Sequence, residues 1–416
     1  MNLRKSLTET SFSSHKPSYL LFGVFSCVVF CFLLNQKEAK AFQPNKKGIV
    51  KGATMRIAGK YKFSVTKNAR SSDVSWTIDR EETDEKGEST LTLIKNVGSA
   101  KGKEATFDLP KTAGKETIYH INAVGKDFQD SLKIKVFEPN RPSSFVYKSK
   151  GNPDVRAFIL VPENLNSATR IILVMSGVQR NADEYLNSWT IWASQNNYIA
   201  ISPNFDEKNW DGSRGYNLGN VFTGDEGKGA LNPRSKWSFT IVEGIYQQVR
   251  SEFNLSDDQF DIFGHSAGAQ FVHRFMLFNP QAKVRTAIAA NPGWYTLPDL
   301  NHNYSYGLKH PMLSFTKQDL IDWTNRRIII MRGTADTSRE GALRKTPEAD
   351  AQGQNRFERA AFMFAKIKAL NLQTKWQLID VEGVNHNQQK MAIAAQEFLQ
   401  KQNKPIQKNN KLSFKF

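Results

Sequence analysis

Cysteine is nearly absent from this chain of 416 residues, because the sequence holds only Cys27 and Cys31, both near its start. A protein that has lost that first segment can form neither a disulfide nor a thiolate metal site. A disulfide-stabilised scaffold and a cysteine zinc site are therefore excluded. Stability must come from buried apolar side chains, and a hydrophobic content of 39% with 28 Phe is enough to build such cores.

Long apolar runs are scarce as well, and the one that stands out is Tyr19–Leu34. It follows a basic start and precedes a polar stretch that ends in Ala39-Lys-Ala41. These are the three regions of a secretory signal peptide, so we predict that residues 1–41 are cleaved before Phe42 and that the mature protein is secreted or periplasmic, with no membrane association. A retained anchor is the alternative, because the run approaches the length of a membrane span.

Acidic residues are fewer than basic ones, 40 against 57, and the formal net charge is +17. The basic residues are scattered over both halves of the chain, which is typical of a solvated surface. Affinity for anionic material, such as an acidic polysaccharide or the cell envelope, is the functional alternative. No basic and aromatic recognition motif accompanies the charge, so we expect no nucleic-acid partner.

Residues 42–140 carry short runs of alternating apolar and polar residues, separated by Gly, Asp, Asn and Lys. This pattern predicts a β sandwich over these residues. The runs Tyr61–Thr66, Val74–Ile78 and Ser131–Val136 loosely resemble bacterial immunoglobulin-like or PKD-type modules, although the acidic turn of PKD modules is missing. The resemblance implies a spacer, with binding of a glycan or polymer as the alternative. The predicted strands are 61–66, 73–78, 90–94, 105–109, 117–124 and 131–137.

After the linker Glu138–Pro142 the pattern changes to apolar strands that alternate with amphipathic helices. We predict a second domain over residues 141–401, a mostly parallel sheet with helices on both faces, and a basic tail over 402–416. Two long irregular stretches, 203–235 and 291–325, interrupt it, and such loops usually form lids or binding walls. The predicted strands are 156–161, 170–175, 198–202, 260–263, 284–289, 327–331 and 375–381, and the predicted helices are 182–194, 237–252, 269–278, 356–370 and 388–401.

The strongest chemical signal is Gly264-His-Ser-Ala-Gly268, which matches the pattern G-x-S-x-G. It follows a predicted strand and leads into a predicted helix, so Ser266 would lie on a tight strand-to-helix turn. The glycines permit that geometry, and the N-terminus of the helix would direct its amides toward a developing oxyanion. Ser266 is therefore the predicted nucleophile.

A serine nucleophile needs a base, and in this type of domain the acid and then the histidine follow the serine, each after a later strand. His386 follows the last predicted strand and directly precedes the last helix, whereas the other downstream histidines lie in the helix after Ser266 or in an irregular stretch. Asp336 lies in the turn after the strand 327–331. We therefore predict a catalytic triad in which Asp336 orients the imidazole of His386.

An oxyanion hole needs two backbone amides, one from the residue after the nucleophile and one from the loop after an earlier strand. Ala267 provides the first. The strand 170–175 and the loop Ser176–Ala182 are placed to provide the second, and Val178 is the candidate.

Three aromatic residues lie in the irregular stretches. Trp294 and Tyr295 open the second stretch and Trp210 lies in the first. Exposed rings at these positions would stack on an acyl group or a sugar ring, so we predict that they form the substrate-binding wall. Packing in the core beneath the loops is the alternative that the sequence leaves equally open.

The segments Ser176–Ala182, Gly264–Gly268, Gly333–Asp336 and Gly383–His386 together resemble the branch of the α/β-hydrolases that contains polyhydroxybutyrate depolymerases and feruloyl and acetylxylan esterases. The resemblance implies an α/β-hydrolase domain and a secreted serine carboxylic ester hydrolase with no cofactor or metal. Its substrate would be an ester, either small or displayed on an anionic polysaccharide or a polyester. The family usually has His where this chain has Ser176, so the resemblance does not extend to the shape of the pocket.

Two other functions remain open. A serine peptidase of the prolyl-oligopeptidase type shares the fold and triad, but such enzymes usually continue the motif with a further Gly where this chain has Ala269. A surface-binding protein that has lost catalysis is the second. The complete Ser, Asp and His set argues against it.

Overall fold

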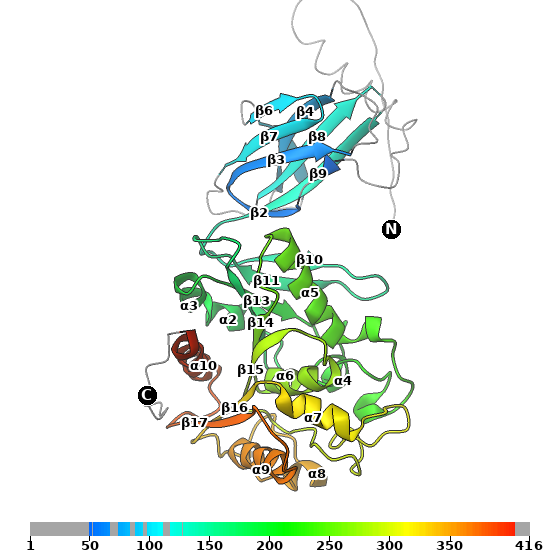
Figure 1. Cartoon of the computed structure of the whole chain (residues 1–416), viewed down its shortest axis with the longest axis vertical. Coiled ribbons are helices and arrows are strands. Elements are labelled where there is room, and N and C mark those ends of the chain that lie inside the picture. Colours follow the sequence, from blue (N-terminus) through cyan, green and yellow to red (C-terminus); the bar gives the residue numbers. More distant parts are fainter. Residues whose placement is uncertain are drawn as a thin grey trace, which may run out of the picture.

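The structure, a computed structural model of the chain, describes residues 50–51, 53–66, 74–83, 88–94, 98–110, 117–126 and 128–403. The predicted signal peptide, residues 1–41, lies outside the described residues, as does all but the beginning of the predicted tail, 402–416. The described residues form three sheets, of which the largest is flanked by helices (Figure 1). No helix in this part of the chain is long and apolar enough to cross a membrane.

Two smaller sheets precede the large one. Their strands are β1 (Val50–Lys51), β2 (Met55–Ile57), β3 (Gly59–Val65), β4 (Val74–Thr83), β5 (Ser89–Leu93), β6 (Gly98–Lys101), β7 (Glu104–Leu109), β8 (Thr117–Gly125) and β9 (Phe128–Phe137). One sheet has the order β1-β3-β7-β6 and the other β2-β9-β8-β4-β5. Side chains of both sheets, such as Phe63, Ile78 and Ile134, meet in one apolar cluster, because alternate residues of a strand face the same side. The strands β3, β4, β5, β7, β8 and β9 overlap the predicted ones, although β4 extends to Thr83 and β9 begins at Phe128. The assignment to an immunoglobulin-like module stays a prediction.

The large sheet begins directly after the linker. Its strands are β10 (Ser143–Tyr147), β11 (Val155–Leu160), β12 (Arg170–Met175), β13 (Tyr198–Asn204), β14 (Phe260–His265), β15 (Val284–Ala290), β16 (Ile328–Gly333) and β17 (Gln377–Val381). Their order is β10-β11-β13-β12-β14-β15-β16-β17. The pairs from β13 through β17 are parallel, and β10 and β11 join the edge antiparallel. The predicted, mostly parallel sheet is therefore confirmed.

Helices cover both faces of this sheet. They are α2 (Ala182–Asn187), α3 (Thr190–Gln195), α4 (Gly212–Gly215), α5 (Ser238–Glu252), α6 (Ala267–Phe278), α7 (Lys317–Asn325), α8 (Pro347–Asp350), α9 (Arg356–Ala369) and α10 (Gln388–Asn403). In β12, Ile171 and Leu173 point into an apolar cluster with α5, α6, α7 and α9. Ile172 and Val174 point into a second cluster with α2, α3 and α10. The unbroken apolar run of β12 thus reflects burial on both faces.

The predicted helix 182–194 is wrong in one respect, since it is split into α2 and α3 by Ser188 and Trp189. Asn187 and Ser188 are weak helix formers. The Trp189 ring is buried between Trp192 and Phe263, at centroid distances of 5.4 and 5.1 Å. The break lets that ring turn onto the sheet.

The carboxylate of Glu252 attaches the segment around β2 to α5, one of the helices that cover the large sheet. Glu252, the last residue of α5, accepts hydrogen bonds from the Thr54 amide at 2.6 Å, the Thr54 hydroxyl at 2.7 Å and the Met55 amide at 3.2 Å. Met55 and Phe137 also belong to the apolar cluster beneath α5. The residues before the linker are therefore attached to the helices by polar and apolar contacts.

The carboxyl ends of β12, β14, β16 and β17 lie at the same edge of the sheet, because these strands run parallel. The loops that follow them converge at this edge, where ligands of open α/β sheets usually bind.

Candidate active site

Ser266 occupies the turn between β14 and α6. Its φ of 57° and ψ of −117° are rarely adopted by residues other than glycine and cost on the order of 1–3 kcal/mol. The flanking glycines make the turn possible. A Cβ at Gly264 would lie 2.2 Å from the Gly268 carbonyl oxygen, and a Cβ at Gly268 would lie 2.1 Å from the Met175 carbonyl oxygen. The close packing of these backbones holds Ser266 at the edge of the sheet.

The three predicted triad residues meet at this turn. His386 Nε2 lies 3.0 Å from Ser266 Oγ, although 120 positions separate the two residues. His386 Nδ1 lies 2.7 Å from Oδ2 of Asp336, a side chain that is 1% exposed. With a proton on Nδ1, the imidazole donates to Asp336 and leaves Nε2 free to accept the serine proton. The geometry therefore permits activation of the Ser266 hydroxyl.

Asn291 couples the loops that carry Asp336 and His386. It follows β15 with a φ of 48°, which Asn tolerates better than most residues. Its Oδ1 accepts a hydrogen bond from the Gly333 amide at 2.8 Å, and its Nδ2 donates to the Asn385 carbonyl at 3.2 Å. Because Gly333 ends the strand before Asp336 and Asn385 adjoins His386, one side chain aligns both loops.

The other oxygen of the Asp336 carboxylate faces an arginine. Nη1 of Arg356, the first residue of α9, lies 3.6 Å from Oδ1, and both side chains are buried. Burial lowers the pKa of the Arg356 guanidinium, and the charge of Asp336 opposes that shift. A buried carboxylate needs charged or hydrogen-bonding partners to offset its loss of hydration. Arg356 and His386 thus hold Asp336 from two sides.

Two uncharged side chains, His265 and Tyr185, support the imidazole of His386. The His265 ring packs on the His386 ring at a centroid distance of 4.5 Å, and its Nδ1 lies 3.0 Å from the Tyr185 hydroxyl. Burial, followed by the nearby His386 and Arg356, lowers the pKa of His265 well below its ordinary range. Burial also raises the pKa of Tyr185. The two side chains therefore fix the plane of the His386 ring without adding a charge beside it.

A pocket of about 560 Å³ opens in front of Ser266 and His386. Apart from His265, Ser266 and Arg356, its lining residues come from 177–185, 335–342 and 385–388, the segments that follow β12, β16 and β17. Among the described residues, no group of three or more His, Cys, Asp or Glu side chains could hold a metal ion. The chemistry that this pocket offers is a hydroxyl, an imidazole and backbone amides.

The candidates for the oxyanion hole flank this pocket. Val178 is 50% exposed and lines the pocket together with Ser266, and Ala267 is the first residue of α6. Ser176, where the family usually has His, is buried, and its carbonyl accepts a hydrogen bond from the Tyr216 hydroxyl at 2.7 Å. The departure at Ser176 therefore changes the packing beneath the loop and not the lining of the pocket.

The predicted substrate-binding wall is wrong. Trp294, Tyr295 and Trp210 are 2%, 0% and 2% exposed, and none of them lines the pocket. The guanidinium groups of Arg274 and Arg344 lie over the Trp294 ring, at 4.1 and 4.8 Å from its centroid. These arginines come from α6 and from the segment before α8, so the packing depends on contacts distant in sequence. Core packing, the alternative, is what the structure shows.

The irregular stretches 203–235 and 291–325 do not line the pocket either. They contact each other instead, with the Phe222 and Tyr304 ring centroids 5.5 Å apart and His310 Nε2 lying 2.8 Å from the Gly227 carbonyl oxygen. The expectation that they form a lid or wall is therefore wrong for this pocket.

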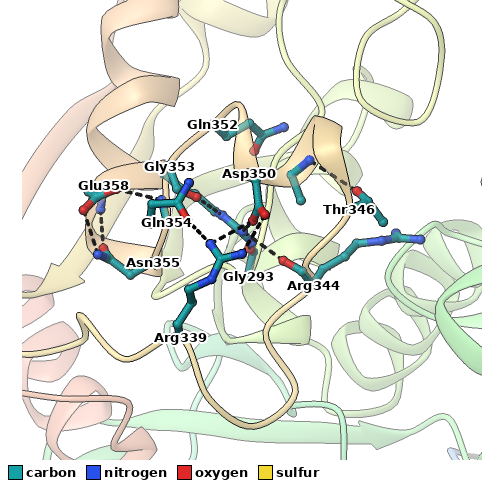
Figure 2. Close-up of polar contacts among 12 residues, drawn as sticks. Gly293, Arg339, Arg344, Thr346, Asp350, Gln352, Gly353, Gln354, Asn355 and Glu358 are labelled. Carbon is teal, nitrogen blue, oxygen red and sulfur yellow. Dashed lines mark hydrogen bonds and ion pairs between the residues drawn. The ribbon is translucent and has the colours of Figure 1, made fainter.

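A polar network anchors the pocket wall formed by residues 338–342 (Figure 2). Arg339 points toward the Asp350 carboxylate and contacts its two oxygens at 2.7 and 3.2 Å. The buried Arg359 donates to the same carboxylate at 3.0 Å and to the Arg344 carbonyl at 2.9 Å. Residues 338–342 are thus held by two contacts. Arg339 within the segment binds Asp350, and Arg359 binds the carbonyl of Arg344, which follows the segment.

Sequence reasoning missed three residues that support the triad from behind. Asn291 had a readable signal, since Asn before Pro-Gly at the end of a strand marks a tight turn. Arg356 and Tyr185 had none, because an arginine or a tyrosine in an amphipathic helix has many other uses.

No protein-family model matches this chain, and no curated protein sequence matches it closely enough to count as a relative. The solved structures that are similar to it include two hydrolases. Poly(aspartic acid) hydrolase-1 from Sphingomonas sp. KT-1 is 33% identical with a TM-score of 0.60, over 64% of this chain and 100% of that one. LpqC, poly(3-hydroxybutyrate) depolymerase from Bordetella parapertussis, is 28% identical with a TM-score of 0.59, over 64% of this chain and 92% of that one. Their likeness in fold and the complete coverage of the Sphingomonas enzyme lead to one conclusion: this chain belongs to the α/β-hydrolase family of poly(aspartic acid) hydrolase-1.

Proposed function

We propose that this chain is a secreted serine hydrolase that cleaves carboxylic esters through an acyl-enzyme. Ser266 is the nucleophile, His386 the general base and Asp336 the carboxylate that orients the imidazole. The observation that carries the proposal is the continuous series of contacts from Asp336 through His386 to Ser266, which ends at an open pocket.

The reaction follows from these positions. His386 takes the proton of Ser266 Oγ as that oxygen attacks the ester carbonyl carbon, and Asp336 stabilises the imidazolium. The amides of Ala267 and Val178 donate to the resulting oxyanion. When the tetrahedral intermediate collapses, His386 returns the proton to the departing alkoxide, which leaves an acyl-enzyme and an alcohol. Water repeats the sequence, releases the carboxylic acid and restores the serine.

Polymer-linked esters are the proposed natural substrates, with an export signal at residues 1–41 and a spacer formed by the two smaller sheets. One neighbour is named for poly(3-hydroxybutyrate), whose links are esters, and it supports this choice. The other is named for poly(aspartic acid), whose links are amides, so amide hydrolysis is the second candidate.

One panel of assays separates the two. The purified protein is incubated with a fluorophosphonate probe, p-nitrophenyl esters, acetylated and feruloylated glycans, polyhydroxybutyrate and peptidyl amides. We expect labelling at Ser266 and release of product from esters. Cleavage of amides without esters would overturn the ester proposal. An unlabelled, inactive protein would instead favour a non-catalytic binding protein.

Arg356→Met should reduce kcat by about 10- to 100-fold, because Asp336 loses the cation on its second oxygen and orients His386 less well. Steady-state turnover of a p-nitrophenyl ester measures the loss.

Arg356→Lys is the matched variant, since it keeps the charge with fewer donors. It should restore part of kcat. An Arg356→Met variant with the wild-type kcat would show that Arg356 only fills space.

A further inference from the structure

Three acidic side chains and one basic side chain line the pocket. They are Glu184, Asp336, Glu340 and Arg356. Arg356 and Asp336 are buried and face each other, so each charge offsets the other. Glu184 and Glu340 are exposed, and no ion pair between either carboxylate and a basic side chain is recorded among the described residues. The charges open to an entering substrate are therefore two carboxylates.

Hydrogen bonds hold the Glu184 carboxylate and the backbone of Glu340 on the wall. Glu184 lies in the first turn of α2, where its Oε2 accepts a hydrogen bond from Asn181 Nδ2 at 2.6 Å. The Glu340 amide donates to Ser338 Oγ at 3.1 Å. Arg339, the basic residue beside Glu340, points instead toward Asp350 (Figure 2) and does not line the pocket. The polar network of this wall therefore leaves Glu340 on the lining of the pocket and holds Arg339 away from it.

Most of the other lining residues are small or polar, and the larger apolar ones are Val178 and Tyr185. The described lining residues include no Trp or Phe. Stacking on a large aromatic face therefore does not outweigh the electrostatic effect of the two carboxylates.

From this arrangement we infer that Glu184 and Glu340 make the pocket selective for charge: it takes neutral or cationic acyl esters and disfavours anionic ones. The inference rests on the proposed esterase function and specifies its substrate class. It argues against an anionic group beside the scissile bond, even though the chain as a whole carries +17. A polyanion such as poly(aspartic acid) is therefore a poor substrate, and a neutral polyester or a neutral glycan ester is a better one.

The test compares p-nitrophenyl esters whose acyl chains end in a trimethylammonium group, in the isosteric tert-butyl group or in a carboxylate. At low ionic strength, kcat/KM should fall in that order, with a spread between the cationic and anionic esters of about tenfold. The spread should shrink in high salt, since ions screen exposed charges. It should also shrink to about twofold in the double variant Glu184→Gln/Glu340→Gln. Poly(aspartic acid) should release no product under conditions that degrade a neutral polyester.

The matched control is Glu348→Gln. Glu348 is an exposed carboxylate in the same segment between β16 and α9, but it lines a separate hollow. This variant should keep the wild-type spread. Equal kcat/KM for the anionic and neutral esters, or an unchanged spread in the double variant, would overturn the inference while leaving the esterase function intact. Absence of turnover on all three esters would overturn the esterase function itself, and the inference with it.

Discussion

Ser266→Ala is expected to lower kcat for ester hydrolysis by about 10⁴- to 10⁶-fold while the protein stays folded. The hydroxyl that faces His386 is the proposed nucleophile, and no other side chain can form the same acyl-enzyme at that turn. His386→Ala should cost a similar factor. The double variant should be no worse than either single one, because the residues act as a unit. Steady-state turnover of a p-nitrophenyl ester measures these effects.

Ser256→Ala is a suitable control, since Ser256 is exposed and lies before β14, at the opposite end of that strand from Ser266. It should keep the wild-type rate. Circular dichroism and urea unfolding should be alike for the wild type and all four variants. If Ser266→Ala or His386→Ala retained more than about a tenth of the wild-type rate, the triad would be assigned to the wrong residues.

Gly268→Ala should be strongly damaging, although it adds only one methyl group. Its new methyl group would lie 2.1 Å from the Met175 carbonyl oxygen and 2.6 Å from the carbonyl carbon, and backbone atoms cannot move aside as a flexible side chain can. We expect the turn at Ser266 to shift, with a loss of at least about 100-fold in kcat, because a displacement of about 1 Å has that cost. The free energy of unfolding should fall by about 2–4 kcal/mol.

This direction is opposite to the usual one, since replacing a helical glycine by alanine normally stabilises a protein by about 1 kcal/mol. Gly151→Ala is the control, because Gly151 has a φ of 78° but open space around its Cα. It should lose about 1 kcal/mol of stability and no activity. A fully active Gly268→Ala variant would mean that the strand and helix are not packed as closely as described.

The contact between Ser266, Asp336 and His386 could be predicted because each residue lies in the same local pattern, an apolar strand followed by a short polar turn. The parallel sheet then determines where the three turns meet, so order along the chain was sufficient. The bounds of α5, α6, α9 and α10 were predicted to within about two residues for the same reason, since long periodic segments decide their own structure.

The pocket wall could not be predicted, because it depends on how long loops pack. The sequence predicted Trp294 as a substrate-binding residue, yet the guanidinium groups of Arg274 and Arg344 lie over its ring. Neither arginine is near it in sequence, and a cation over an aromatic face leaves no periodic signal. Arg356 was missed for a related reason, since its partner Asp336 lies in another loop.

The attachment of β2 to Glu252 determines how far any polymer held by the smaller sheets must reach. Glu252 ends α5, and the chain then enters β14 at Phe260, whereas Ser266 follows the opposite end of that strand. A strand of six residues spans about 20 Å, so a polymer segment bound near β2 must extend at least that far to present a link to Ser266. Because the attachment is not a loose tether, the effective concentration of a tethered substrate at Ser266 depends on the length and stiffness of the polymer itself. Fragments shorter than this span would gain nothing from the smaller sheets, and the gain would be largest for chains whose length matches the span.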